Sequence, residues 1–394
     1  MLNVDVAVVG AGPAGAAAAC YLATAGVRIA LIDQATFPRE KVCGDGVSSQ
    51  GLQALARLGL ETWSARFPAP ETLLLTSNRH IVETHPPPDD ASCYGRTIPR
   101  RKLDARLVEA AVNAGARLFE GVRVRDVVRR AGPHPVVTAK DLRLSADLVI
   151  LADGAHAPIT RRVGLLDSRP QFVAVRQYLI GDRGPMGRLE IHFLDTLLPG
   201  YLWIFPMGPG RVNVGLGTSL ARVRHDNVDL RATLAAFLEQ QRNAEGRLAE
   251  AEPLGRAQGH PIRTAFGQTR THAERLLVAG EATGLVSPLS GEGIAPALES
   301  GELAAQHALR ALNAGDLSAT ALAAYTRALH TRYAAEWRYA RWLRQALDQP
   351  WLLNRTFRRL AAEPTLALLV GKVVIGAASP RRLLRPTTLI RLLV

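Results

Sequence analysis

Residues 4–33 constrain the fold more than any other part of this chain. Residues 4–9 are apolar and mostly β-branched apart from Asp5, as in a strand that is buried on both faces of a parallel sheet. Gly10, Gly12 and Gly15 follow at the start of an Ala-rich helix, and a second apolar run ends at Asp33. Such glycines permit a tight turn, leave bare backbone for a pyrophosphate and let the helix pack closely on the strand. Asp33 is placed to bind an adenosine ribose, so the segment predicts a dinucleotide site rather than an ordinary βαβ turn.

The size and composition predict a globular protein with more than one domain. The chain has 394 residues, of which 47% are hydrophobic and 21% are charged. Its three cysteines, Cys20, Cys43 and Cys93, are typical of a reducing cytoplasm and too few for a disulfide framework or a structural zinc; no metal site is expected. We find neither a cleavable leader nor an apolar run long enough to span a bilayer, which predicts a cytoplasmic protein.

Positive charge is concentrated near the C-terminus. The net charge of the chain is +13, and residues 327–394 contain twelve arginines and one lysine against three acidic residues. The same region contains Trp337 and Trp342, and its apolar stretch at residues 365–378 is too short to cross a bilayer. This combination favours a peripheral contact with the inner face of an anionic cell membrane over a nucleic-acid partner. A basic helical cap without any membrane contact is the alternative.

Two loops in the first half of the chain are predicted to approach a ligand. Residues 43–46 read Cys-Gly-Asp-Gly, and glycines at this density leave the backbone accessible. Cys43 would be reactive only with a lowered pKa, so a redox role and simple packing beside a ligand both stay open. Asp153 and Gly154 follow the strand expected at residues 146–151, at the edge where open α/β sheets bind ligands.

A later loop has the same character. Residues 280–284 follow a strand expected at residues 275–279, and a glycine-rich segment then leads into a helix at residues 294–312. A helix N-terminus beside glycines attracts anions, so the chain is predicted to hold a long cofactor from both ends. Arg100, at the entry to a helix expected at residues 103–114, could reach a phosphate of the same ligand.

Residues 172–218 differ from the rest of the chain and predict a second domain. Four segments alternate apolar and polar residues between Gly and Pro, which predicts a four-stranded antiparallel sheet. Tyr201, Trp203 and Phe205 alternate along one strand and therefore share a face. We expect this face to contact the substrate; the alternative is a packed aromatic core.

Together these motifs resemble the FAD-dependent oxidoreductases of the p-hydroxybenzoate hydroxylase type. GAGPAG, ADG and the Gly-acid turn near residue 280 carry this likeness, while KVCGDG, PGYLWIFP and PLSGEGI look like the geranylgeranyl reductase family. The resemblance covers about residues 1–345. It implies an α/β (α+β) two-domain flavoprotein, with a Rossmann-like FAD-binding domain, an inserted antiparallel-sheet substrate domain and a helical C-terminal region. The implied division is residues 1–67, 97–165 and 272–312 for FAD, residues 68–96 and 166–271 for the substrate, and residues 313–394 for the basic helical region.

The same resemblance implies cofactor-binding roles. Asp33 would bind the adenosine ribose, Arg100 would approach the FAD, and Glu281, where the family usually has Asp, would bind the ribityl chain or a phosphate. The backbone of Gly291 and Gly293 would stabilise negative charge on the reduced flavin ring. The implied cofactor-binding residues are Gly10, Gly12, Pro13, Ala14, Gly15, Asp33, Gln34, Cys43, Gly44, Asp45, Gly46, Arg100, Val124, Asp153, Gly154, Gly280, Glu281, Pro288, Gly291, Glu292, Gly293 and Ile294.

The implied activity is FAD-dependent reduction of isolated C=C bonds in a geranylgeranyl or polyprenyl chain of a lipid, quinone or pigment precursor. Such a bond has no carbonyl to accept charge, so a hydride from N5 of the reduced flavin must be accompanied by a proton. Cys43, Asp45 and Tyr201 are the candidate proton donors, and the sequence does not choose among them. The rings of Tyr201, Trp203 and Phe205 could stabilise developing positive charge, which makes Trp203 a further catalytic candidate.

Other functions are compatible with parts of the pattern. An FAD-dependent monooxygenase of a hydrophobic substrate is the main alternative, because the fold does not fix the chemistry. A flavin halogenase would need a lysine that the chain does not have between Lys41 and Lys102, and a non-catalytic flavin- or lipid-binding protein would not need both glycine loops. NAD(P)H and ferredoxin stay open as electron donors, since no second glycine motif marks a nicotinamide site. The prenyl carrier and the oligomeric state are not indicated.

Overall fold

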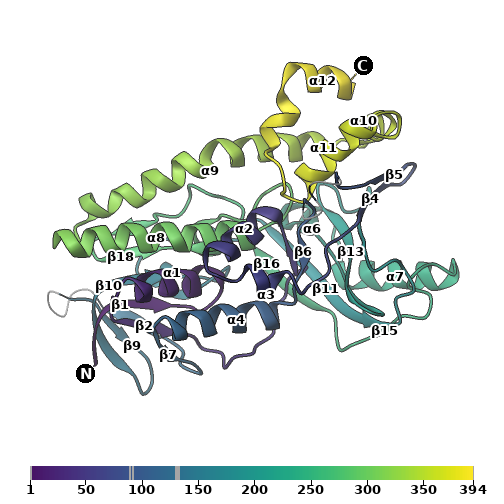
Figure 1. Ribbon diagram of the computed structural model, residues 1–394. Helices are drawn as coiled ribbons and strands as arrows, with labels where there is room; N and C mark the ends of the chain where they lie inside the picture. The colour runs from purple at the N-terminus through teal and green to yellow at the C-terminus, as the bar shows by residue number, and fades with distance from the viewer. Residues whose placement is uncertain (1, 88–89, 91–92, 129–133, 394) are drawn as a thin grey trace.

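The structure is a computed structural model that describes residues 2–87, 90, 93–128 and 134–393 (Figure 1). Within these residues, two large sheets stand side by side, and two long helices, α8 (Ile294–Ala314) and α9 (Ala319–Leu347), run along the first of them (Figure 1). The C-terminal helices, yellow in Figure 1, lie at the end of the second sheet and pack against it.

The first sheet is built around the predicted N-terminal strand. β1 (Leu2–Val9) lies between β2 (Ile29–Ile32) and β10 (Arg143–Leu151), and both pairings are parallel. Val8 packs into one apolar cluster and Val9 into another, so β1 is buried on both faces, as its sequence predicts. The sheet has the order β17-β18-β10-β1-β2-β7, extended by β8 and β9. These outer strands are β7 (Arg117–Phe119), β8 (Asp126–Val128), β9 (Val136–Thr138), β17 (His272–Ala273) and β18 (Leu276–Val278).

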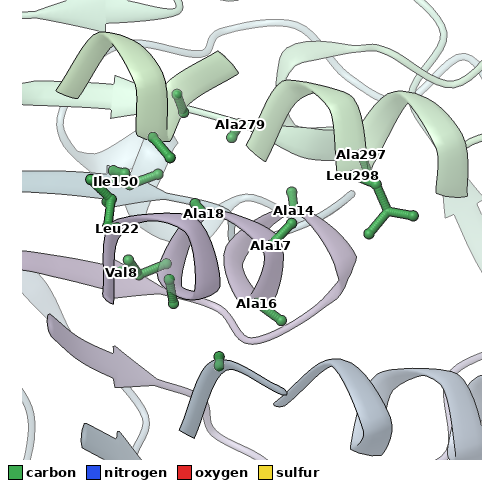
Figure 2. Packing of buried hydrophobic residues seen from close by; sticks show 14 of the residues in the cluster. Val8, Ala14, Ala16, Ala17, Ala18, Leu22, Ile150, Ala279, Ala297 and Leu298 are labelled. Carbon is green, nitrogen blue, oxygen red and sulfur yellow. The ribbon is translucent and has the colours of Figure 1, made fainter. Parts of the chain in front are cut away.

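Small residues allow the helices to lie close to this sheet. α1 (Pro13–Thr24) packs against α8 and α4 (Arg100–Asn113), and Figure 2 shows its alanines beside Ala297 and Leu298 of α8. The approach is so close that a Cβ on Gly301 of α8 would lie 2.2 Å from the carbonyl oxygen of Ala14. Shorter helices complete this half of the protein: α2 (Ser49–Arg57), α3 (Glu61–Ser64), α5 (Pro158–Arg162) and the 3₁₀ helix η1 (Gly280–Thr283).

Residues 172–218 form the four expected antiparallel strands, but within a larger sheet. β11 (Phe172–Ile180), β14 (Arg211–Ser219), β13 (Tyr201–Gly208) and β12 (Arg188–Phe193) are neighbours in that order, and all their pairings are antiparallel. β4 (Thr72–Ser77) adds to β12 in parallel, a pairing between distant segments that no local pattern indicates. Peripheral elements are β3 (Gly46–Val47), β5 (Ile81–Thr84), β6 (Arg96–Thr97), β15 (Glu252–Pro253), β16 (Gln258–Ile262), α6 (Leu220–His225) and α7 (Leu230–Asn243).

The C-terminal helices pack against the second sheet. α11 (Pro364–Val374) buries Leu366, Val370 and Val373 in the cluster that contains Leu73 of β4. The apolar stretch at residues 365–378 therefore serves mainly to cover protein. Within the described part of the chain, no helix has both the length and the apolar character needed to cross a membrane. The other elements here are α10 (Pro350–Ala362), η2 (Pro380–Leu384) and α12 (Pro386–Leu393).

Candidate functional site

A cavity of about 1090 Å³ is lined by residues of both sheets. The turns that follow β1, β10 and β18 contribute to its wall, as do residues 39–44, residues 46–48 and the turn before α8. Strands β12 and β13 of the second sheet and the end of α11 line it too. The same cavity is therefore lined by the segments predicted to bind a cofactor and by those predicted to bind a substrate.

The first glycine turn has the geometry that its sequence predicts. Gly10 has φ +101°, and a Cβ there would lie 2.3 Å from the carbonyl oxygen of Ala152. A Cβ on Gly15 would lie 1.8 Å from the carbonyl oxygen of Gly10, so only glycine lets α1 pack so close to the turn. Gly15 is not among the residues that line the cavity, and the close contact with Gly10 supports the packing role predicted for it.

The start of α1 is open towards the cavity. A Cβ on Gly12 would meet only the guanidinium of Arg39, at 3.7 Å, and Gly12, Pro13 and Ala14 all line the cavity. The positive end of the α1 dipole and unpaired N–H groups are therefore available to an anion here. Arg39, which the sequence analysis missed, adds a cation and is held by an ion pair of 2.9 Å with the buried Asp104.

The acid at the end of β2 is fixed by backbone groups. Asp33 accepts hydrogen bonds from the N–H groups of Ala11 (2.7 Å) and Ala35 (2.8 Å), and it lines the cavity together with Gln34 and Val124. Each carboxylate oxygen can accept more than one hydrogen bond, so Asp33 can still bind a ribose hydroxyl.

Asp153 lines the cavity with Gly154, but its hydrogen bonds are structural. Its carboxylate accepts the N–H groups of Ile159 (2.8 Å) and Thr160 (3.0 Å) and the hydroxyl of Thr160 (2.6 Å). These bonds cap the start of α5, because they satisfy N–H groups that have no partner within the helix. The side chain thus holds the loop that borders the ligand.

Three polar residues of the cavity lining come from segments that are distant in the sequence and lie close together. The ammonium of Lys41 contacts the ring of His260 on β16, and Glu281 of η1 lies near enough to act on Lys41 electrostatically. Burial lowers the pKa of Lys41 to about 8, although the Glu281 carboxylate opposes this shift. Burial and Lys41 together lower the pKa of His260 to about 3, so this imidazole is neutral. Gly280, Glu281, Lys41 and His260 all line the cavity.

Asp45 occupies a different place from the one predicted for a proton donor. It is fully buried and is not among the residues that line the cavity, whereas Gly44 and Gly46 beside it are. Its backbone has φ +62°, and its carboxylate accepts hydrogen bonds from the hydroxyl of Tyr178 (2.6 Å) and the amide of Asn213 (2.9 Å). Burial raises its pKa to about 6. In the structure Asp45 positions the 43–46 loop and is not part of the cavity lining; its role as a proton donor stays a prediction.

Asn213 connects this loop to the substrate side. Its amide nitrogen also donates to the carbonyl oxygen of Cys43 (2.8 Å), and its amide oxygen accepts the indole N–H of Trp203 (3.1 Å). The residue is fully buried on β14. Sequence reasoning missed it because a lone Asn in an alternating strand gives no signal.

Cys43 and Arg100 lie together at the cavity wall. Burial raises the pKa of the Cys43 thiol, and the Arg100 guanidinium only partly opposes this shift, so the group is a protonated thiol at neutral pH. Arg100 donates two hydrogen bonds of 2.8 Å to Asp104, which fixes the guanidinium at the entry to α4, where it borders the cavity as predicted.

The aromatic residues of β13 do share a face, and that face lines the cavity. The ring centroids of Tyr201 and Trp203 are 6.2 Å apart, and those of Trp203 and Phe205 are 6.4 Å apart. The hydroxyl of Tyr201 donates to the carbonyl oxygen of Ser290 (2.5 Å), and burial raises its pKa above the ordinary value. A Cβ on Gly215 of the neighbouring strand would lie 2.3 Å from the Trp203 ring, so any larger residue there would displace the indole.

The turn before α8 is organised by its own hydrogen bonds. Pro288, Gly291, Glu292, Gly293 and Ile294 all line the cavity. The N–H of Gly291 donates to the carbonyl oxygen of Ser287 (3.0 Å), and the role of the Gly291 and Gly293 backbone beside the flavin stays a prediction. Glu292 accepts the N–H of Ala295 (2.9 Å), and burial raises the pKa of Glu292 to about 7.

Several other lining residues were missed by sequence reasoning. Leu189 and Ile191 of β12 lie beside the aromatic strand, with Ile191 directly opposite Trp203 in the ladder. Val374 and Ile375, at the end of α11, form another apolar part of the wall. For Lys41, its position two residues before the 43–46 turn was an available signal; for the C-terminal residues there was none.

The arrangement fits FAD. Open glycine backbone, a helix N-terminus and Arg39 suit a pyrophosphate, Asp33 suits a ribose, and the same cavity continues to an aromatic wall. The fold and this site define an FAD-dependent oxidoreductase.

Comparisons with known proteins lead to the same class. The pattern of an FAD binding domain family matches residues 3–176. The chain is 34% identical to the menaquinone reductase of Mycobacterium tuberculosis over 316 residues, covering 77% of this chain and 76% of that one. It is 30% identical to the digeranylgeranylglycerophospholipid reductase of Methanoculleus marisnigri, covering 85% and 82%. The fold matches a geranylgeranyl bacteriochlorophyll reductase-like protein of Thermoplasma acidophilum over the full length of both chains, with a TM-score of 0.83 and 22% identity. The chain belongs to the geranylgeranyl reductase family of FAD-dependent oxidoreductases.

Proposed function

We propose that this protein reduces isolated C=C bonds in a prenyl chain carried by a lipid, a quinone or a pigment precursor. The observation that carries the proposal is that the nucleotide-binding turns and an apolar, aromatic wall belong to the same cavity. The names of the relatives point to a quinone and a digeranylgeranyl lipid as substrate classes. In this proposal residues 68–96 and 166–271 contribute most of the substrate side, and α11 closes it.

The side chains in the cavity fit the demands of this chemistry. FAD, when bound and reduced, supplies a hydride. Leu189, Ile191 and Val374 offer apolar contact to a prenyl chain, while Trp203 presents an aromatic ring to any positive charge that develops on it. Of the predicted proton donors, Cys43 and Tyr201 line the cavity and Asp45 does not.

The test is anaerobic incubation of the FAD-loaded, dithionite-reduced protein with a geranylgeranyl compound, followed by mass spectrometry. Products heavier by pairs of hydrogen atoms are expected. If instead oxygen enters the product only when air is admitted, the protein is a monooxygenase. Trp203→Ala should lower product formation by about tenfold or more while FAD occupancy stays unchanged, because the residue belongs to the aromatic wall on β13 and not to the turn at Gly10 and Gly12. An unchanged rate would remove Trp203 from the mechanism.

We further propose that the C-terminal helices touch an anionic membrane. Trp342, Trp351 and Ile390 are 53%, 65% and 60% exposed, and exposed arginines lie beside them in the same helices. Deleting residues 380–394 would also strip Leu383 from the core, so point substitutions are the better test. Trp351→Ser should reduce sedimentation with anionic vesicles and leave thermal stability unchanged. Equal sedimentation of both proteins, or none of either, would refute the contact.

A further inference from the structure

A second, smaller cavity lies behind the turn that precedes α8. Its volume is about 110 Å³, enough for a few water molecules, and polar groups border it. Ser287, Ser290 and Glu292 contribute from the turn, while Arg332, Tyr333 and Glu336 contribute from α9. The loop that leads to η2 closes another side with Ser379.

Glu292 lies in the wall between the two cavities. It lines both of them, as do Ser287 and Ser290 of the same turn. Its position is fixed from two sides: Oε1 accepts the N–H of Ala295, and the backbone at Gly376 is so close that a Cβ there would lie 3.1 Å from the Cβ of Glu292. The C-terminal segment therefore packs against the side chain of Glu292, a residue that lines both spaces.

The charges around Glu292 set its proton affinity. Burial is the main cause that raises its pKa to about 7, and the carboxylate of Glu299 on α8 raises it further. Glu299 is held by the hydroxyl of Tyr333 (2.5 Å) and by an ion pair with Arg332 (3.0 Å), both on α9. Glu336 of α9 lines the small cavity, and Tyr201 of β13 faces the same turn from the large one. A carboxyl group in this setting exchanges protons near neutral pH.

We propose that Glu292 is a further catalytic residue, which passes a proton from the small cavity to the double bond in the large one. This step rests on the prenyl reductase function proposed above. The O–H bond of the protonated carboxyl breaks and the proton forms a C–H bond at one alkene carbon, while the hydride supplied by reduced FAD forms the C–H bond at the other. The π bond is thereby consumed, and the resulting carboxylate takes a proton back from solvent through the small cavity. Cys43 and Tyr201 do not line the small cavity.

The experiment compares Glu292→Gln with Glu292→Asp and a control, Glu302→Gln. Glu302 lies on α8, the helix that follows the turn with Glu292; it pairs with Arg57 at 2.9 Å and lines neither cavity. One readout needs no substrate: in infrared difference spectra of the FAD-loaded protein, the band of a protonated carboxyl should titrate near pH 7. The component of this band that belongs to Glu292 should be missing in Glu292→Gln and retained in Glu302→Gln, whereas Asp45, with a pKa of about 6, contributes the same component to both variants.

The second readout is the pH profile of kcat for anaerobic prenyl reduction. The wild-type kcat should fall as pH rises above about 7 because the proton donor is lost. In Glu292→Gln kcat should drop by about 10²-fold or more and lose this pH dependence, with KM and FAD affinity nearly unchanged. Glu292→Asp should recover part of the rate and a limb in the pH profile, which a purely structural role would not produce.

The outcomes separate the two proposals. If Glu292→Gln keeps the wild-type kcat and pH profile, or keeps the full wild-type infrared band, Glu292 is not the proton donor although the protein remains a prenyl reductase. If the wild-type protein reduces no prenyl compound, the proposed function fails and the proton step fails with it.

Discussion

The two ends of the large cavity are built in different ways. The nucleotide end consists mainly of backbone from short motifs, such as the turn at Gly10 and Gly12, and each motif is contiguous in sequence. The substrate end consists of side chains from β12, β13, the turn before α8 and the end of α11. A cofactor that is recognised by backbone leaves a local signature, whereas a substrate compartment of this kind exists only after the chain has folded.

The largest expected effect is at the nucleotide end. Gly15→Ala should prevent correct packing of α1, because its Cβ would lie 1.8 Å from the carbonyl oxygen of Gly10, and backbone there has no room to yield. We expect loss of the folded protein, measured by circular dichroism and by the yield of soluble protein.

Gly12→Ala is the matched variant that separates folding from cofactor binding. A Cβ at Gly12 meets only the tip of Arg39, so the fold and the melting temperature should be retained while FAD binding falls by about tenfold or more. Flavin absorbance after purification measures the occupancy. A stable Gly15→Ala protein that binds FAD normally would contradict this account of the turn.

The second prediction concerns the hydrogen bonds of Asn213, which connect the 43–46 loop to the aromatic strand β13. Asn213→Leu leaves Asp45, Cys43 and Trp203 each without one hydrogen-bond partner in a buried region. At about 1–3 kcal/mol for each unsatisfied group, the free energy of unfolding should fall by about 4 kcal/mol. Urea denaturation measures the change. A loss below about 1 kcal/mol would show that the 43–46 loop does not depend on β14.

The nucleotide-binding half of the protein and the antiparallel strands could be predicted from the sequence. The contacts between these parts could not. Buried runs and glycine spacing depend on local chemistry, so β1, α1 and the turn at Asp33 could be predicted. The hidden position of Asp45 could not, because it depends on Tyr178 and Asn213, which are remote in the chain. The packing of the C-terminal helices could not be predicted for the same reason: an apolar stretch looks alike whether it faces lipid or covers β4.

The third prediction concerns the free energy of unfolding as a function of pH. The pKa of Glu292 is about 7 in the folded protein and has its ordinary value of 4.5 when the chain unfolds. The folded state holds the proton more tightly, so this group's stabilisation is complete below pH 4.5 and is lost as pH rises to about 7. At ~1.4 kcal/mol for each pH unit the loss is about 3 kcal/mol.

Glu292→Gln should abolish this part of the pH dependence. Asp45, with a pKa of about 6, acts in the same direction in both proteins, so the difference between wild type and variant is the quantity to measure. Urea denaturation at several pH values gives it. Parallel curves for the two proteins would mean that Glu292 has an ordinary pKa.

The smallest expected effect is at the apolar part of the wall that the end of α11 forms. Val374→Phe adds volume at the end of α11, where the residue lines the cavity, and should reduce the space available to a prenyl chain. We expect kcat/KM for a geranylgeranyl compound to fall by about tenfold, equivalent to ~1.4 kcal/mol, and that for a shorter prenyl compound to change little. Leu368→Phe on the same helix, which packs against the core and is not among the lining residues, is the control for general disturbance. An equal loss for long and short prenyl compounds in Val374→Phe would mean that α11 supports the sheet but does not limit the length of the substrate. The side chains that contact the substrate would then come from β12 and β13 alone.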